Sequence, residues 1–573
     1  MASLQARRVR GHTYWHIVES RRVNGKPRPV PIAYLGKADD LLARLQGTDA
    51  FELRSKSHGA VAATWALAKE LDLAGTIDRH LAAFGRRIRP GRSSGIRRPV
   101  KNDGLTVGQS LTLAAIGRAC HATSKRGFAE WIATTTLGDL AEVPDVGRLT
   151  SQHFWDQMEQ VPVESIAAME QELVSRVLER LALAVDTLLF DATNFFTFIA
   201  STNARATLPA RGHNKQKRDD LRQVSIALLC SREGGVPLWH HTYGGQIADS
   251  KCFAEVLPLI RQRLVDLGRD IQSLTIVYDK GNVSRANQQK VDLSKLHYVT
   301  AVTTASQPEL VKEANQKLEP VILGNVETVK AFRTTRKIWG AERTAVVLVS
   351  ERLREGQMRG VLQHVASAKQ WLSSLQDTLA RGKQKRDRAR IQHDIEKRLQ
   401  GRQRLNSVLR VDLSGEDPNL KLTYEFNQEA FDALAAESFG RIVLISDRSD
   451  WSTAEIINAY HGQSGIEAVF AHLKDPIHLA LRPQFHWTDQ KLHVHVFVCL
   501  LGYLLSRVLF LRARQAQSPY ASMEKLLDVL TEVRLVTVAR RSPTGKGRLS
   551  ISTRLEKTDP TLAALLPALG VQS

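Results

Sequence analysis

The sequence predicts a mixed α/β protein of several domains, and three observations lead to this fold class. Its 573 residues are enough for several domains with large cores. Apolar residues recur with helical spacing in some segments and form short β-like runs in others. The hydrophobic content of 43% and the charged content of 24% are ordinary for folded proteins. A net charge of +21 further predicts a polyanionic partner and salt-sensitive association.

Residues 1–50 are predicted to form a basic N-terminal β-hairpin unit. Two β-like runs, 14–20 and 29–35, flank Asn24-Gly25, a strong hairpin signal because both residues tolerate positive φ. Either this hairpin contacts DNA or it is a solvated hairpin with a generic basic surface. The basic residues that decorate it are Arg7, Arg8, Arg10, Arg21, Arg22, Lys26 and Arg28.

Residues 51–180 are predicted to form a mainly helical N-terminal domain that binds DNA. Segments 60–73 and 106–120 place apolar residues three and four positions apart, and 163–183 is a long helix candidate. Between the first two lies a Pro/Gly/Ser/Arg-rich run, 86–101, without periodicity, which indicates an exposed linker. This linker either clamps phosphates or is only a solvated loop.

Residues 181–302 are predicted to form the first part of an α/β core. An apolar run ends in Asp191-Ala-Thr193-Asn194, and a later run, Val-Tyr-Asp279-Lys-Gly281, ends in an aspartate and a glycine turn. The expected order is β-β-β-α-β-α-β, with carboxylates at the ends of the first and fourth strands. The segments are strands 183–190, 221–231, 236–243, 274–279 and 297–302, with helices 253–267 and 284–291.

The remaining chain is predicted to hold an inserted subdomain, the second part of the core and a tail. Segment 303–440 is β-rich at first and then long, charged helix with a basic run at 381–390, which either lies along DNA or is a solvated helical hairpin. Segment 441–512 begins with a buried strand, 441–447, and ends in an apolar helix, 492–511. Residues 513–573 are expected to be a helical and basic C-terminal tail.

Cysteine usage and hydropathy predict a cytoplasmic protein without a membrane segment. The four cysteines form no C-x-x-C pair, which argues against a zinc knuckle or a disulfide framework. The N-terminus lacks the apolar core of a signal peptide. The most apolar run, 494–505, is too short to span a bilayer.

One stretch, 459–474, is predicted to be the helix around which the core is organised. At about 100° per residue, Tyr460, Gln463, Glu467 and Lys474 fall within about 60° of one another on one face. Apolar positions on the other side hold this helix on a core. Pro476 disfavours the α conformation at the residue before it and so ends the helix.

Asp191, Asp279 and Glu467 together suggest a divalent metal site. Magnesium takes a few carboxylates plus water and substrate phosphate, and two such ions stabilise the attacking and leaving oxygens of phosphoryl transfer. Asp186 is an alternative to Asp191, but residues five apart on a strand face opposite sides and cannot share a metal. We prefer Asp191. The alternative for both aspartates is a strand-end capping role.

At these residues the sequence resembles the DDE transposases of bacterial insertion sequences. The motifs are Asp191-Ala-Thr193-Asn194, Val-Tyr-Asp279-Lys-Gly281 and Tyr460-x2-Gln463-x3-Glu467-x6-Lys474. The last spacing matches the branch marked by Tyr-x2-Arg-x3-Glu-x6-Lys, except that Gln463 stands where that signature has arginine. Supporting segments at 124–131, 212–223, 235–245 and 481–495 are also similar, so the resemblance covers most of the chain.

The resemblance implies an RNase-H-like catalytic core interrupted by an insertion before the glutamate. It implies that Asp191, Asp279 and Glu467 hold Mg²⁺ or Mn²⁺, as two ions. It implies binding to double-stranded DNA at terminal inverted repeats, metal-assisted hydrolysis at the element ends and joining of the freed 3′-hydroxyl to target DNA. A homodimer on DNA, in the nucleoid of a bacterial cytoplasm, is the expected working unit. The residues expected to contact DNA are Tyr460, Gln463, Lys474 and Arg482.

Two other functions remain open from the sequence. One is an RNase-H-like DNA nuclease or resolvase that cuts without strand transfer. The other is a catalytically silent DNA-binding relative, for which Gln463 is the hint, since an amide has neither the charge nor the bidentate fork of arginine. Several histidines could suggest a zinc site, but structural roles or positions near phosphates are favoured. Trp487 either stacks on a base or lies in the core. These histidines are His240, His241, His486, His493 and His495.

Overall fold

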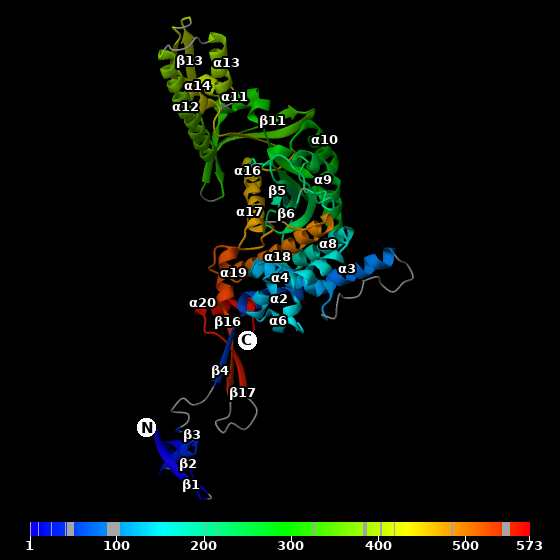
Figure 1. Cartoon of the computed structure of the whole chain (residues 1–573), viewed down its shortest axis with the longest axis vertical. Helices are drawn as coiled ribbons and strands as arrows, with labels where there is room; N and C mark the ends of the chain where they lie inside the picture. Colours follow the sequence, from blue (N-terminus) through cyan, green and yellow to red (C-terminus); the bar gives the residue numbers. More distant parts are fainter. Residues whose placement is uncertain are drawn as a thin grey trace. The chain divides into compact units, whose positions relative to one another are not determined.

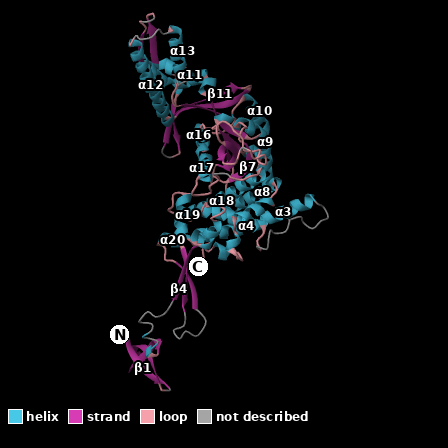
Figure 2. Cartoon of the chain, in the orientation of Figure 1, coloured by secondary structure: helices cyan, strands magenta, loops and turns pink. Residues whose placement is uncertain are grey.

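A computed structural model shows the chain as two compact units, each with helices and strands (Figures 1 and 2). The helical unit comprises Met1–Leu181, Leu473–Leu481 and Gln490–Ser573, and the core unit comprises Ala182–His472 and Arg482–Asp489. The mixed α/β fold class is confirmed. The structure describes residues 2–9, 11–23, 26–39, 42, 51–88, 104–200, 202–214, 216–324, 327–381, 387–400, 404–416, 419–482, 485–540 and 550–572.

Some sequence predictions fall outside the described residues. These are the Asn24-Gly25 turn, the linker from residue 89 to 101 and the middle of the basic run, 382–386.

The N-terminal segment forms a three-stranded antiparallel sheet, β1-β2-β3 (Figure 1). The predicted hairpin corresponds to β2 (His12–Val23) and β3 (Lys26–Gly36). A strand that the sequence analysis did not predict, β1 (Ala2–Val9), pairs with β2 along its whole length, and all its residues are exposed. Because β1 buries nothing, it lacks the apolar alternation by which strands are found in a sequence.

A second small sheet joins distant parts of the chain within the helical unit. Its order is β17-β16-β4, formed by Ser550–Leu555, Arg534–Arg540 and Phe51–Ser57. The tail therefore contains strands as well as helices. The helices of this unit are α2 (Gly59–Glu70), α3 (Leu73–Ile88), α4 (Val107–Cys120), α5 (Phe128–Ala133), α6 (Leu137–Leu140), α7 (Ser151–Glu159), α8 (Val163–Leu181), α18 (Asp489–Gln515), α19 (Met523–Glu532) and α20 (Pro560–Leu565).

The apolar helix α18 is longer than the run that predicts it. With 27 residues, this helix is long and apolar enough to cross a membrane by length and composition. The expectation that the apolar segment is too short, which was based on 494–505 alone, was therefore wrong. However, 83% of its most apolar window is buried inside the protein. A Cβ at Gly502 would come within 2.9 Å of the Ala115 carbonyl oxygen on α4, so the two helices approach closely. A buried core helix accounts for the apolar run.

The core unit is built on a nine-stranded sheet whose first half has RNase-H-like topology. The order in this half is β7-β6-β5-β8-β9; β5, β6 and β7 run antiparallel, whereas β5, β8 and β9 run parallel. Helices α9 and α10 make the crossovers to β8 and β9. The elements are β5 (Thr187–Thr197), β6 (Arg222–Ser231), β7 (Pro237–Gly244), α9 (Asp249–Asp266), β8 (Thr275–Tyr278), α10 (Arg285–Ser294) and β9 (His297–Val302). This is the predicted β-β-β-α-β-α-β order.

The other half of the sheet comes mostly from the segment that the sequence assigns to the insertion. Strand β15 (Arg441–Ser446) pairs with β9, and β12 (Ala341–Val349), β11 (Glu327–Ile338) and β10 (Glu319–Leu323) follow, all antiparallel. Strand β15 returns the chain to the sheet after the insertion. The β-rich part of the segment therefore extends the core sheet, preceded by α11 (Pro308–Lys317).

The charged helices of the insertion have a hydrophobic core of their own. Helices α12 (Glu351–Ala380) and α13 (Arg388–Leu399) pack with α14 (Leu405–Val408), the hairpin β13 (Leu409–Ser414)–β14 (Lys421–Phe426) and α15 (Gln428–Glu437) (Figure 1). Leu372, Val408 and Phe431 are among its buried residues. The charged surface of these helices thus covers an apolar stripe, as expected for amphipathic helices.

The predicted helix 459–474 is two consecutive helices. Helix α16 spans Thr453–His461 and α17 spans Gln463–Lys474, with Gly462 between them. The Gly462 N–H bonds to the carbonyls of both Asn458 and Ala459, so the last turn of α16 tightens before α17 begins. Tyr460 therefore lies on one helix and the other residues of the predicted face lie on the next.

Candidate active site

Asp191 and Asp279 lie side by side on two adjacent parallel strands. The last residue pair between β5 and β8 is Phe190–Tyr278, and the two aspartates are the next residues on each strand. Neighbouring strands lie about 4.8 Å apart, and residues at the same level of adjacent strands face the same side. The two carboxylates therefore share one face of the sheet, and both residues are partly exposed.

The opposite face at this level is aromatic and buried. The rings of Phe190 and Tyr278 both contact Phe253 on α9, with centroid distances of 4.9 and 4.7 Å. Alternation along each strand then places the following aspartate on the other side, away from α9. The aromatic packing thereby fixes the direction in which the carboxylates point.

The placement of Asp191 within its strand differs from the prediction. It was expected at the C-terminal end of a strand, but β5 continues to Thr197 by pairing with β6, as far as Thr197–Arg222. The residues directly after Asp191, Ala192-Thr193-Asn194, interrupt the apolar run, and pairing with β6 carries the strand through them to Phe195 and Phe196. Asp186, the alternative that we disfavoured, precedes β5 and is exposed.

Helices α16 and α17 reach the strands that carry the carboxylates. The Tyr460 hydroxyl donates to Asp279 Oδ1 at 3.5 Å. With its amide oxygen turned toward β8, Gln463 accepts from the backbone N–H groups of Asp279 (3.0 Å) and Tyr278 (3.2 Å). A Cβ at Gly465 would be in van der Waals contact, 3.4 Å, with Leu189, which shares a strand face with Asp191. The start of α17 therefore packs against β5 and β8.

The charges of two carboxylates, Asp279 and Glu467, affect the pKa of Tyr460. Burial is the main cause that raises the pKa of Tyr460 well above 10, and the charge of Asp279, its hydrogen bond and the charge of Glu467 add to it. Tyr460 is therefore a neutral hydrogen-bond donor at physiological pH. Glu467 itself is exposed on α17, one helical turn after Gln463.

Both aspartates also make the local bonds expected of a purely structural role. Asp191 Oδ1 accepts from the N–H of Ala192 at 2.8 Å. Asp279 caps the short 3₁₀ turn Lys280–Asn282 and accepts from Gly281 at 3.4 Å. These bonds occupy one carboxylate oxygen each. The shared face and the approach of Tyr460 go beyond what strand-end capping requires.

The three carboxylates do not form a preassembled metal cluster. Across the described part of the chain, no three His, Cys, Asp or Glu side chains are grouped so that they could hold a metal ion. The two adjacent aspartates and the exposed Glu467 on α17 are nevertheless oxygen donors of the kind that Mg²⁺ and Mn²⁺ prefer. The oxygen ligands are suitable for such an ion, although the three carboxylates are not gathered into one cluster among the described residues.

The remaining predicted DNA contacts are Lys474 and Arg482. Lys474 is the last residue of α17 and is partly exposed, and Arg482 is exposed. Their roles in DNA binding stay predictions.

Aromatic residues near the end of the core unit form a group that the sequence analysis largely missed. Trp487 is 61% exposed, so a core role for it is wrong. Phe198 and Phe485, both more than half exposed, lie 5.7 Å apart between ring centroids, and Phe198 directly follows β5. Asn203 donates to the Trp487 carbonyl at 2.9 Å and ties the two segments together. Surface exposure of large rings has no signature in the sequence.

Two of these histidines, His241 and His495, lie in structural surroundings. His241 stacks between Trp239 and Tyr243 on one face of β7, with centroid distances of 5.8 and 6.0 Å. Burial lowers the pKa of His241 below its usual range, so its ring is neutral at pH 7. His495 contacts Cys499 on α18 at 3.5 Å. A core role explains both.

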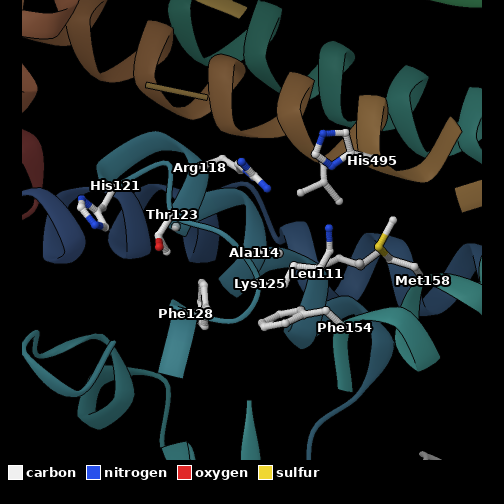
Figure 3. A pocket seen from close by; sticks show the side chains of 12 residues that line it. Leu111, Ala114, Arg118, His121, Thr123, Lys125, Phe128, Phe154, Met158 and His495 are labelled. Atoms are coloured by element: carbon white, nitrogen blue, oxygen red, sulfur yellow. The ribbon is translucent and has the colours of Figure 1, made fainter. Parts of the chain in front are cut away.

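His495 also lines a small cavity of about 30 Å³ in the helical unit, shown in Figure 3. The nitrogen-bearing ends of Arg118 and Lys125 are directed to the same space (Figure 3). Burial first, and then repulsion from Arg118, lower the pKa of Lys125 to about 7. No acidic residue is among the described residues that line the cavity.

Residues 186–505 match the model of the protein family described as "Transposase DDE domain". No curated protein matches this chain. The solved structures similar to it include the piggyBac transposase synaptic complex with hairpin DNA, at 9% identity and a TM-score of 0.38, over 82% of this chain and 79% of that one. They also include the Mos1 transposase paired-end complex with left transposon end, at 10% identity and a TM-score of 0.16, over 35% and 60%.

Proposed function

This chain belongs to the transposase DDE-domain family, and from that premise we propose that it cleaves DNA at the terminal inverted repeats of its own insertion sequence and joins the freed ends to target DNA. The observation that carries the proposal is the pair Asp191 and Asp279, side by side on β5 and β8, with Tyr460 bonded to Asp279. Carboxylates placed in this way can hold divalent ions that assist phosphodiester transfer.

We propose that Asp191, Asp279 and Glu467 hold Mg²⁺ or Mn²⁺, as two ions. When bound, such ions stabilise the charge that develops on the attacking and leaving oxygens. Tyr460 stays a neutral donor and orients the Asp279 carboxylate. Gln463 holds the start of α17 against β8 through its two backbone bonds, which places Glu467 one turn further along the same helix.

DNA is the proposed partner because the net charge is +21. Lys474 and Arg482 are proposed to contact phosphates, and Tyr460 and Gln463 to line the path of the scissile strand. Phosphate contacts release counterions, so binding should weaken steeply with salt. We propose that the working unit is a homodimer on two element ends, in the nucleoid of a bacterial cytoplasm.

A second candidate is a catalytically silent DNA-binding relative. The observation that favours it is Gln463, which occupies the position of a signature arginine. A silent relative would bind the element ends and leave them uncut.

The testing experiment is a cleavage assay on a linear fragment that carries the gene with its natural flanking DNA, with and without Mg²⁺. Magnesium-dependent breaks at two fixed positions that bracket the gene support the transposase, and joined products exclude a nuclease without strand transfer. Asp191→Asn should remove cleavage but retain binding. Asp186→Asn is the matched control, because Asp186 is exposed and precedes the strand. Binding without breaks would establish the silent relative, and normal cutting by Asp191→Asn would refute the site.

A further inference from the structure

One face of the N-terminal sheet carries a connected group of aromatic rings. Tyr14 and His16 are two residues apart on β2 and therefore point to the same side. His16 pairs directly with Tyr34 on β3, which adds Tyr34 to that face. The Tyr34 ring lies 5.0 Å from His16 and 6.0 Å from Tyr14, measured between centroids, so the three rings form one surface. We call these three residues the ring face.

The ring face is open to solvent. Tyr34 is 60% exposed, Tyr14 and His16 are partly exposed, and the neighbouring strand β1 is exposed throughout. Aromatic side chains are usually covered in folded proteins, and rings gathered on an exposed surface commonly mark a binding site. Core packing does not explain why three rings meet here.

The surroundings of the ring face are strongly basic. Arg7 on β1 pairs directly with Tyr14 and so stands on the same face. Glu19 is the acidic residue of segment 1–37, and it forms an ion pair with Arg21 at 2.9 Å. This charge is complementary to phosphates. The basic residues of this segment are Arg7, Arg8, Arg10, Arg21, Arg22, Lys26, Arg28 and Lys37.

We propose that the ring face binds unpaired DNA bases, which stack on Tyr14 and Tyr34 while Arg7 contacts a phosphate of the same strand. Bases inside a duplex stack on one another and offer no free ring surface, whereas every unpaired base has one. The proposal rests on DNA as the partner of the proposed function, and it adds a single-strand site on the N-terminal sheet. Cutting and joining of strands would expose such bases at the ends of the element.

The test measures fluorescence anisotropy of the full-length chain with a labelled single-stranded oligonucleotide and with the matching duplex, in the absence of divalent metal. Replacing both rings, Tyr14→Ala with Tyr34→Ala, should weaken single-strand binding by roughly ten-fold or more, since stacking on an aromatic ring is worth about 1–3 kcal/mol per base. Duplex binding should change little. The matched pair Tyr14→Phe with Tyr34→Phe keeps the rings and should retain the single-strand affinity.

Two further variants separate stacking from charge and from folding. Arg7→Gln should reduce the slope of log affinity against log salt by about 0.7 for the single strand, as expected for one lost phosphate contact. Thr13→Ala, on the other face of β2, should behave as the wild type. The inference is wrong if the alanine pair binds the single strand as tightly as the wild type, or if it loses single-strand and duplex binding equally. Because no cleavage is measured, an inactive catalytic site would leave this test intact.

Discussion

Two pairs of like charges in this protein are held in different surroundings. In the core unit, Asp191 and Asp279 share a partly exposed face of the sheet, where Tyr460 donates to one of them. In the helical unit, Arg118 and Lys125 face a small cavity whose other lining residues are mostly apolar, such as Phe154 (Figure 3). All four residues are partly exposed, so the two pairs differ in what surrounds their charged groups and not in overall exposure.

The two pairs differ in how the repulsion between their like charges is reduced. A partly exposed carboxylate pair keeps its charge by hydration, by hydrogen bonds and, in the proposed function, by a divalent cation. The buried ammonium group of Lys125, beside the guanidinium of Arg118, is poorly hydrated. Its neutral form is therefore favoured, and the pKa of Lys125 falls to about 7.

The largest effect is expected at the carboxylates. Asp279→Asn removes the negative charge while keeping the shape, and we expect cleavage to fall by more than about 100-fold, in the range seen when one electrostatic group is removed from an active site. DNA binding should remain. The measurement is the rate of strand cleavage at saturating protein. A rate near that of the wild type would show that Asp279 serves only as the cap of its turn.

The next effect concerns Lys125 and depends on pH. The folded pKa of about 7 lies below the ordinary value of 10.5, so between these values the unfolded chain binds the additional proton. Stability from this group therefore rises with pH across that window, and burial of the charge costs most below pH 7. Lys125→Met removes the charge and should raise the melting temperature at pH 6, with a gain that shrinks toward pH 10.

Thermal melts at a series of pH values check this prediction. Lys69→Met on α2 is the matched control, because Lys69 is exposed and should show no pH-dependent gain. A gain for Lys125→Met that is independent of pH would mean that Lys125 has the same pKa in the folded and the unfolded chain, and the prediction would be wrong.

A smaller effect is expected at Gln463. Its oxygen accepts from two backbone N–H groups of β8, and an arginine side chain has no acceptor. Gln463→Arg should therefore lower stability by about 1–3 kcal/mol, the cost of unsatisfied donors, and lower cleavage with it. Gln463→Glu keeps an acceptor and should lose less stability. If arginine instead raises cleavage, the position acts on phosphate, and the silent-relative hypothesis gains support.

The smallest effect is expected at Tyr460. The hydrogen bond to Asp279 is long, 3.5 Å, so Tyr460→Phe should slow cleavage by only several-fold, equivalent to about 1 kcal/mol. Because the pKa of Tyr460 is raised above 10, the cleavage rate of the wild type should show no step from this group up to that pH. A loss as large as that of Asp279→Asn would instead make Tyr460 a participant in the reaction.

Several parts of the candidate site were predictable from local pattern. The apolar run before Asp191, the run before Asp279 and the strand order between them follow from periodicities of two and about 3.6 residues. The prediction of one helix from 459 to 474 placed Tyr460 and Gln463 on a common face, and both residues contact the end of β8, although the helix is interrupted at Gly462.

Other features had no local signal. The second half of β5 exists because β6 pairs with it, and β10, β11 and β12 join the core sheet because β15 bridges them to β9. Strand pairing connects residues far apart in the chain, so a local sequence pattern can predict a strand but not the strand with which it pairs. The exposed rings of Phe198 and Phe485 depend in the same way on what the fold leaves uncovered.

The residue types of the site, the order of its elements and the positive net charge can be read from the chain without its coordinates. The position of Asp191 and Asp279 at the same level of adjacent strands, and the direction of the Gln463 oxygen toward β8, follow from the fold alone. The physical reason is that local conformation follows from neighbours in the chain, whereas register and side-chain direction follow from packing across the sheet, such as the Phe253 contacts with Phe190 and Tyr278.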